Sequence, residues 1–106
     1  MAGETLPVCA ASALPPRTRR VIDRDGLKLV VLNCAGELFA IEDRCSHEDT
    51  PLADGELDEE SCWIECPRHG SRFDLRSGRP LTLPAYQPID VFPVAVIDGI
   101  VTVEVD

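Results

Sequence analysis

Two short segments, each carrying a cysteine and a histidine, constrain this chain more than any other feature. Residues 45–47 read Cys-Ser-His, and residues 66–69 read Cys-Pro-Arg-His. Each segment offers one thiolate and one imidazole, and residues 48–65 separate the two. Loop tips of this kind can hold one metal centre from two sides, so the fold must bring both loops to the same place.

A centre of two irons and two sulfides fits this set of donors. Such a cluster needs two protein ligands for each iron, and here Cys45 and Cys66 would bind one iron while His47 and His69 bind the other. Two neutral imidazoles in place of two thiolates leave the oxidised cluster without net charge. The cluster therefore accepts an electron at a higher potential than an all-cysteine cluster does.

A structural zinc ion is the alternative for the same residues, because two cysteines and two histidines also make a tetrahedral zinc site. Zinc knuckles usually begin from a Cys-x-x-Cys pair, and a histidine two residues after a cysteine is unusual in them. The iron–sulfur hypothesis predicts a red-brown protein, whereas the zinc hypothesis predicts a colourless one.

The order Cys-x-His, then Cys-x-x-His, resembles the ligand motif of the Rieske family. The likeness continues through residues 66–74, Cys-Pro-Arg-His-Gly-Ser-Arg-Phe-Asp, and on to Ser77-Gly78. It implies an all-β, Rieske-like fold: a small antiparallel sandwich or barrel-like base with an inserted cluster-binding lobe. It also implies one Rieske 2Fe–2S cluster, with the ligands Cys45, His47, Cys66 and His69.

This chain departs from the Rieske proteins of respiratory and photosynthetic complexes, which carry one extra cysteine in each ligand loop. Thr50 and Arg68 stand at the corresponding places, so that disulfide across the cluster cannot form. Phe73 stands where those proteins typically have a tyrosine hydroxyl near a ligand sulfur. Fewer hydrogen bonds to sulfur stabilise the reduced state less, so we expect a low potential for the family.

A chain of 106 residues suits a single domain with a modest core. We predict one Rieske domain over residues 1–106, with a base formed by about 1–42 and 84–106 and a cluster-binding lobe over about 43–83. Within the lobe, residues 79–84 read either as the proline-bearing loop that covers the cluster in the family or as a plain connector.

Short apolar runs separated by glycine-containing turns predict strands and no long helix. Asp-Gly at 25–26 and 98–99 and Ala-Gly at 35–36 are typical of hairpin turns. Brief strands are expected in the lobe over residues 61–65 and 71–74. The strands expected in the base cover residues 4–9, 17–23, 27–33, 37–42, 87–97 and 100–105.

Three cysteines remain outside the proposed ligand set, namely Cys9, Cys34 and Cys62. No secretory leader and no run near twenty apolar residues is visible, so we expect a cytoplasmic protein without a membrane segment. In such a reducing compartment we expect all three cysteines to be free thiols that behave as small buried apolar side chains.

A net charge of −9 argues against binding to nucleic acid and to anionic membranes. Seven acidic residues and no basic one lie between positions 48 and 60. This run reads either as a solvated loop or as a docking patch beside the cluster, in which Glu48 and Asp49 would take part.

The resemblance implies a soluble one-electron carrier and not an enzyme. In that role a ferredoxin passes electrons from a flavin-dependent, NADH-consuming reductase to the terminal oxygenase of an aromatic-ring dioxygenase, and we expect a monomer. The chain has only two histidines, so it cannot build the additional iron site of an oxygenase subunit. The alternatives are a zinc-stabilised interaction module without redox function and, less favoured, a small nitrite reductase subunit.

Overall fold

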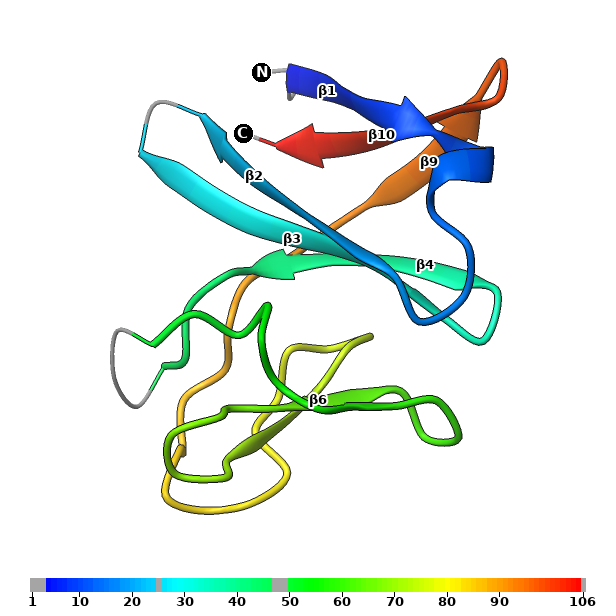
Figure 1. Cartoon of the computed structure of the whole chain (residues 1–106). Coiled ribbons are helices and arrows are strands. Elements are labelled where there is room, and N and C mark those ends of the chain that lie inside the picture. The colour runs from blue at the N-terminus through cyan, green and yellow to red at the C-terminus, as the bar shows by residue number, and fades with distance from the viewer. Residues whose placement is uncertain (1–3, 25, 47–49, 106) are drawn as a thin grey trace.

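The computed structural model describes residues 4–24, 26–46 and 50–105, and these residues form three antiparallel sheets (Figure 1). The helical part of this described chain is a single 3-10 turn, η1 (Ala11–Ala13). None of its helices is long and apolar enough to cross a membrane. The expectation of an all-β fold is confirmed.

The first sheet joins the two ends of the chain in the order β1-β10-β9. Its strands are β1 (Glu4–Ala10), β10 (Ile100–Val105) and β9 (Val94–Ile97). Pro7 cannot donate a ladder hydrogen bond, and the register of β1 against β10 shifts between Pro7 and Cys9. On β10 the alternate residues Val101, Val103 and Val105 are buried, as the sequence pattern predicts.

The second sheet is the predicted meander with one strand added, in the order β2-β3-β4-β8. Its strands are β2 (Arg19–Arg24), β3 (Leu27–Cys34), β4 (Glu37–Glu42) and β8 (Val91–Phe92). Strand β3 is central and is buried on both faces over residues 29–34. Ala35 and Gly36 both adopt positive φ, which gives the tight hairpin between β3 and β4.

Residues 91–97 pass from one base sheet to the other. Strand β8 pairs with β4, whereas β9 pairs with β10, and Pro93 lies between them at the corner. Both strands lie at sheet edges, where a proline is tolerated because no ladder hydrogen bond is lost. The sheets enclose a first core of buried residues: Leu6, Leu14, Leu29, Val31, Ala40, Val101, Val103 and Val105.

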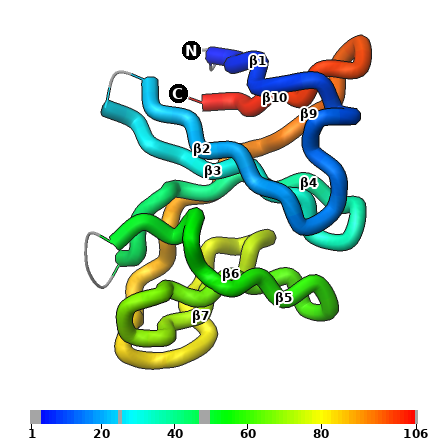
Figure 2. The backbone as a smooth tube through the Cα atoms, viewed as in Figure 1, coloured from blue at the N-terminus to red at the C-terminus, as the bar shows by residue number. Residues whose placement is uncertain are grey.

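The third sheet is small and lies beneath the base, as Figure 2 shows. It consists of β5 (Leu57–Asp58), which the sequence did not indicate, β6 (Trp63–Glu65) and β7 (Arg72–Asp74). We call this sheet and its flanking segments, 43–56 and 75–90, the lobe. A second core fills the space between the lobe and the other face of β3 and β4, and its largest members include Leu32, Ile41, Leu52, Ile64 and Phe73.

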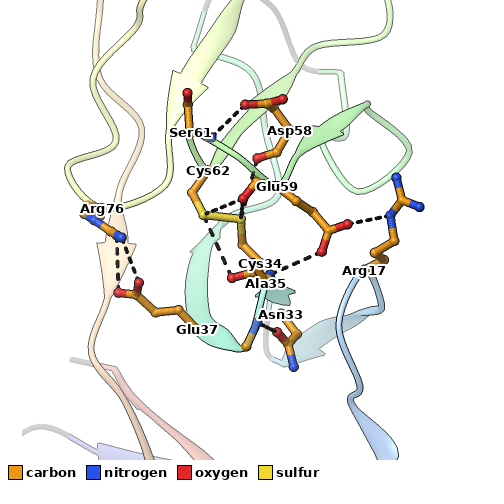
Figure 3. The surroundings of a disulfide bond; sticks show 11 residues. Arg17, Asn33, Cys34, Ala35, Glu37, Asp58, Glu59, Ser61, Cys62 and Arg76 are labelled. Atoms are coloured by element: carbon orange, nitrogen blue, oxygen red, sulfur yellow. Dashed lines mark hydrogen bonds and ion pairs between the residues drawn. A yellow bond between two sulfur atoms is a disulfide. The ribbon is translucent and has the colours of Figure 1, made fainter.

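A disulfide between Cys34 and Cys62 joins the base to the lobe (Figure 3). The expectation that both are free thiols is therefore wrong, whereas Cys9 is half-buried and lies outside the disulfide. The Ala35-Gly36 hairpin places the end of β3 beside the turn between β5 and β6. Twenty-eight positions separate the two cysteines, and their proximity arises from this tertiary packing, which no local pattern reveals.

Two ion pairs flank the disulfide in Figure 3 and also connect base and lobe. Arg76, after β7, pairs with Glu37 of β4 at 2.7 Å, and Arg17 pairs with Glu59 at 2.7 Å. Glu59 also accepts a hydrogen bond from the backbone N–H of Ala35. Part of the acidic run therefore makes internal contacts, while Glu48 and Asp49 of the proposed docking patch lie outside the described residues.

Candidate metal centre

The first ligand segment begins where β4 ends. Cys45 is 1% exposed, and its backbone N–H donates to the carbonyl of Thr50 at 2.9 Å, which curls the segment into a loop. His47, the second predicted ligand of this segment, lies outside the described residues. The structure thus places the thiol of this loop inside the protein.

The second ligand segment is a tight turn between β6 and β7. The N–H of Cys66 donates to the carbonyl of Ser71 at 2.7 Å, and the N–H of Gly70 donates back to the carbonyl of Cys66 at 3.0 Å. Gly70 has φ of 77°, a conformation that glycine adopts without a steric penalty. The turn buries Cys66 to 1% exposure and leaves His69 exposed at the tip.

Both thiols belong to the same buried cluster beneath the base, and neither takes part in the Cys34–Cys62 disulfide. The turn that carries Cys66 presents its imidazole outward instead, on His69. Sulfur donors inside and a nitrogen donor outside match the donor set of a Rieske cluster, in which cysteines hold one iron and histidines the other.

Ser71 supplies a further test of whether these residues fit an iron–sulfur cluster. Its side chain is fully buried, and its Oγ accepts a hydrogen bond from the N–H of Ala85 at 3.0 Å. Within the described parts of the chain the Ser71 hydroxyl proton has no acceptor. A buried donor without a partner is costly, and a cluster sulfur is an acceptor that would satisfy it. The buried Ser71 hydroxyl therefore fits an iron–sulfur cluster beside the second ligand segment.

No three His, Cys, Asp or Glu side chains in residues 4–24, 26–46 and 50–105 form a group that could hold a metal ion. Three of the four predicted ligands fall in these ranges, and the fourth, His47, does not. Assignment of all four residues as ligands therefore stays a prediction.

The segment from Pro80 to Gln87 makes hydrogen bonds on the side of each ligand segment. The hydroxyl of Ser46 donates to the carbonyl of Gln87 at 2.5 Å, on the side of the first segment. On the side of the second, Thr82 Oγ1 accepts from the N–H of Arg72 at 2.9 Å, and Ala85 is held by Ser71. Of these contacts only that of Thr82 falls within residues 79–84, so the covering loop and the plain connector both stay predictions for that stretch.

Two residues that brace the site, Asp43 and Arg19, were not singled out by the sequence patterns. Asp43 is buried, and its carboxylate accepts two backbone N–H groups beyond the first ligand segment. The only local signal was an acidic residue two positions before Cys45, a predicted ligand. Arg19 lies on β2, far from either motif in the sequence, and no sequence pattern indicates its contact with this site.

Comparison with known proteins agrees with this geometry. The family model described as the Rieske [2Fe-2S] domain matches residues 4–93. The ferredoxin subunit of 3-phenylpropionate/cinnamic acid dioxygenase from Photorhabdus laumondii is 38% identical over 92 residues, which cover 87% of this chain and 86% of that protein.

Solved structures show the same relationship. The ferredoxin of carbazole 1,9a-dioxygenase from Nocardioides aromaticivorans IC177 superposes with a TM-score of 0.90 at 32% identity, covering 96% of this chain and 98% of that one. A chain in a complex of reduced oxygenase and oxidised ferredoxin in carbazole 1,9a-dioxygenase gives 0.88 at 40% identity, covering 94% and 92%. This chain belongs to the Rieske [2Fe-2S] domain family, in the branch of the ferredoxin components of dioxygenase systems.

Proposed function

We propose that this chain is a one-electron carrier that delivers electrons to the terminal oxygenase of an aromatic-ring dioxygenase. Its cluster would be held by Cys45 and Cys66 on the inner iron and by His47 and His69 on the outer iron. The observation that carries the proposal is the contrast between the buried thiols and the exposed imidazole of His69.

This contrast indicates that an electron would leave the cluster on the side of the histidines. When bound, a Rieske cluster supplies a reversible one-electron couple. The buried cysteines shield one side from water, while the histidine at the loop tip can reach the surface of a partner. The base stiffens the site, because the core beneath it packs directly against both cysteines.

Two partners follow from this role: a flavin-dependent reductase that takes electrons from NADH, and a terminal oxygenase. The oxygenase is supported by the related ferredoxin that is named in a complex with its oxygenase. The charge of −9 would steer the chain toward basic surfaces on either partner. We also propose that residues 1–106 act as one domain, as a monomer, in the cytoplasm.

The chain is proposed as a carrier and not as a catalyst. A metal site that binds substrate or oxygen needs an open coordination position, and all four ligands in this proposal are used by the cluster. Both histidines of the chain belong to that set. Bond chemistry would take place on the oxygenase.

Reconstitution tests the role directly. The purified protein, a flavin-dependent NADH reductase and an aromatic-ring oxygenase should together oxidise substrate, and omission of this chain should stop turnover. His69→Ala should abolish both turnover and the visible cluster spectrum, whereas the matched variant Cys9→Ala should change neither. A colourless protein that contains one zinc per chain would contradict the proposal.

A further inference from the structure

Residues 52–55 lie between the two ligand segments in the sequence and are held by hydrogen bonds and backbone contacts on several sides. They follow the loop that carries Cys45 and precede β5. A backbone hydrogen bond from Gly55 N–H to the Leu52 carbonyl, 2.9 Å long, folds them into a turn. Leu52, Ala53 and Gly55 are all buried. Any shift of this turn would displace one ligand segment relative to the other.

Asp43 holds one side of the turn. Its Oδ1 accepts from the N–H of Leu52 at 2.9 Å and from the N–H of Ala53 at 2.8 Å, and the side chain is largely buried. Asp43 itself is anchored to the base, because its own N–H donates to the Lys28 carbonyl of β3 at 3.0 Å. The carboxylate therefore joins position 43, before Cys45, to positions 52 and 53, after it.

Arg19 holds the other side of the same turn from strand β2. Its Nη1 donates to the carbonyl of Ala53 and, at 2.7 Å, to the carbonyl of Gly55. Ala53 thus donates to an anionic side chain through its N–H and accepts from a cationic one through its carbonyl. Hydrogen bonds to ionised groups are shorter and stronger than neutral ones, so the turn is fixed at two points.

Gly55 connects this turn to the second ligand segment. A Cβ at position 55 would lie 1.9 Å from the carbonyl oxygen of Glu65, so the backbones touch here. The N–H of Glu65 donates to the carbonyl of Glu56 at 2.8 Å. Glu65 is the last residue of β6 and immediately precedes Cys66. The position of the turn therefore sets the position of the strand that presents Cys66.

We infer that Asp43 and Arg19 are positioning residues that fix the separation of the two ligand segments, and so the geometry of the iron–sulfur cluster. This inference rests on the proposed assignment of Cys45 and Cys66 as ligands. Neither residue touches iron in this account. Both act through residues 52–55, whose opposite ends contact the Cys45 loop and the Cys66 strand.

The test compares Asp43→Ala and Asp43→Asn as holoproteins with a matched control, Asp74→Ala. Asp74 also accepts a backbone N–H, from Ser77 at 2.9 Å, but in a turn that carries no ligand. Three quantities are measured: the g-values of the reduced cluster, the rate of iron release to a chelator and the midpoint of thermal unfolding.

We expect Asp43→Ala to shift the g-values and to speed iron release about tenfold, the scale at which residues behind metal ligands act. Asp43→Asn keeps an oxygen acceptor at the same place and should restore both. Asp74→Ala should lower the unfolding midpoint only. Wild-type g-values and iron release in Asp43→Ala would overturn the inference, and so would an Asn variant as defective as the Ala variant.

Arg19→Gln keeps the inference testable if Asp43→Ala yields no holoprotein. It removes the charge and the fork of donors, so iron release should again accelerate, and an unchanged rate would count against the inference. Cys45→Ala is measured alongside. Its retention of a normal cluster spectrum would refute the ligand assignment, whereas failure of the Asp43 series alone would refute only the positioning role.

Discussion

Ser71 and Phe73 lie two residues apart behind the second ligand segment, and both side chains are fully buried. Ser71 has a hydroxyl proton without an acceptor in the described residues, whereas Phe73 replaces the tyrosine hydroxyl of the respiratory and photosynthetic branch. Hydrogen bonds to cluster sulfur favour the reduced, more negative state. One donor in place of two favours a lower potential.

These two residues bear on the midpoint potential of the cluster. We expect a value toward the low end of the Rieske range of about −150 to +300 mV, and below about +100 mV. Ser71→Ala should lower the potential by roughly 60 mV, which corresponds to about 1.4 kcal/mol of lost stabilisation of the reduced state. Voltammetry on the holoprotein checks both values.

Ser46→Ala is the control for that measurement, since the Ser46 hydroxyl already donates to the carbonyl of Gln87. Its potential should equal that of the wild type. A Ser71→Ala protein with an unchanged potential would mean that this hydroxyl makes no bond to the cluster.

Most strands and turns follow from local sequence patterns, namely alternation of apolar residues and glycine-containing turns. Leu38 and Ala40 face the first core while Phe39 and Ile41 face the second, as the alternation on β4 predicts. Asp98 and Gly99 adopt positive φ in the predicted hairpin turn. Strand β5 was not predicted, because two residues are too few to show the alternation typical of a strand. Its pairing with β6 depends on tertiary contacts.

The long-range contacts could not be predicted from local patterns. The motif identifies Cys45 and Cys66, but Cys34 meets Cys62 only because two turns pack against each other. The contact of Arg19 with Ala53 spans 34 positions and joins strand β2 to the turn that precedes β5. Such pairings depend on how whole elements dock, which a periodicity or a turn signal does not encode.

The close contact between Gly55 and the backbone of Glu65 can be tested by substitution. Gly55→Ala should cost about 1–3 kcal/mol of unfolding free energy, because the new Cβ would overlap the carbonyl of Glu65. Gly36→Ala is a comparison in which the added Cβ meets nothing within 4 Å. Its cost comes from the positive φ alone, about 1–2 kcal/mol.

The iron-release rate separates these two glycine variants. Faster release is expected for Gly55→Ala and not for Gly36→Ala, because only the former displaces the strand that presents Cys66. Both free energies are measured by denaturant unfolding. Equal iron-release rates in the two variants would argue against the contact between residue 55 and β6.

Considered as a whole, the molecule attaches its lobe to the base through several contacts in the described residues, of which two groups bear on stability and on the site. The disulfide and the ion pairs of Arg17 and Arg76 form the first attachment. Arg19, which donates to Gly55, and the backbone N–H of Asp43, which donates to Lys28 of β3, form the second attachment. Exposed ion pairs contribute little, about 0–1 kcal/mol each, so the disulfide dominates the first attachment.

Removal of that disulfide should therefore lower global stability. The double variant Cys34→Ala/Cys62→Ala should lose about 3–4 kcal/mol of unfolding free energy, as expected for a closed loop of this length. Its cluster spectrum should remain that of the wild type. Denatured, unreduced wild-type apoprotein should titrate as three thiols, because three of the five cysteines lie outside the disulfide; five would show that the bond does not form.

Electron delivery should depend on salt, because long-range attraction would steer a chain of charge −9 toward basic surfaces on its proposed partners. We expect the rate of oxygenase reduction to fall as ionic strength rises from about 0.01 to about 0.15 M, where the screening length shortens from about 30 to about 8 Å. Charge reversal at Glu48 and Asp49 tests the proposed docking patch. Stopped-flow rates indifferent to both changes would reject it.

The ligand set itself is tested most directly by metal and sulfide analysis combined with paramagnetic resonance of the dithionite-reduced protein. We predict two irons and two acid-labile sulfides per chain, with the average g-value of mixed histidine and cysteine ligation, and loss of this signal on replacement of His47 or His69. Absence of sulfide, or a signal that survives these replacements, would contradict this prediction.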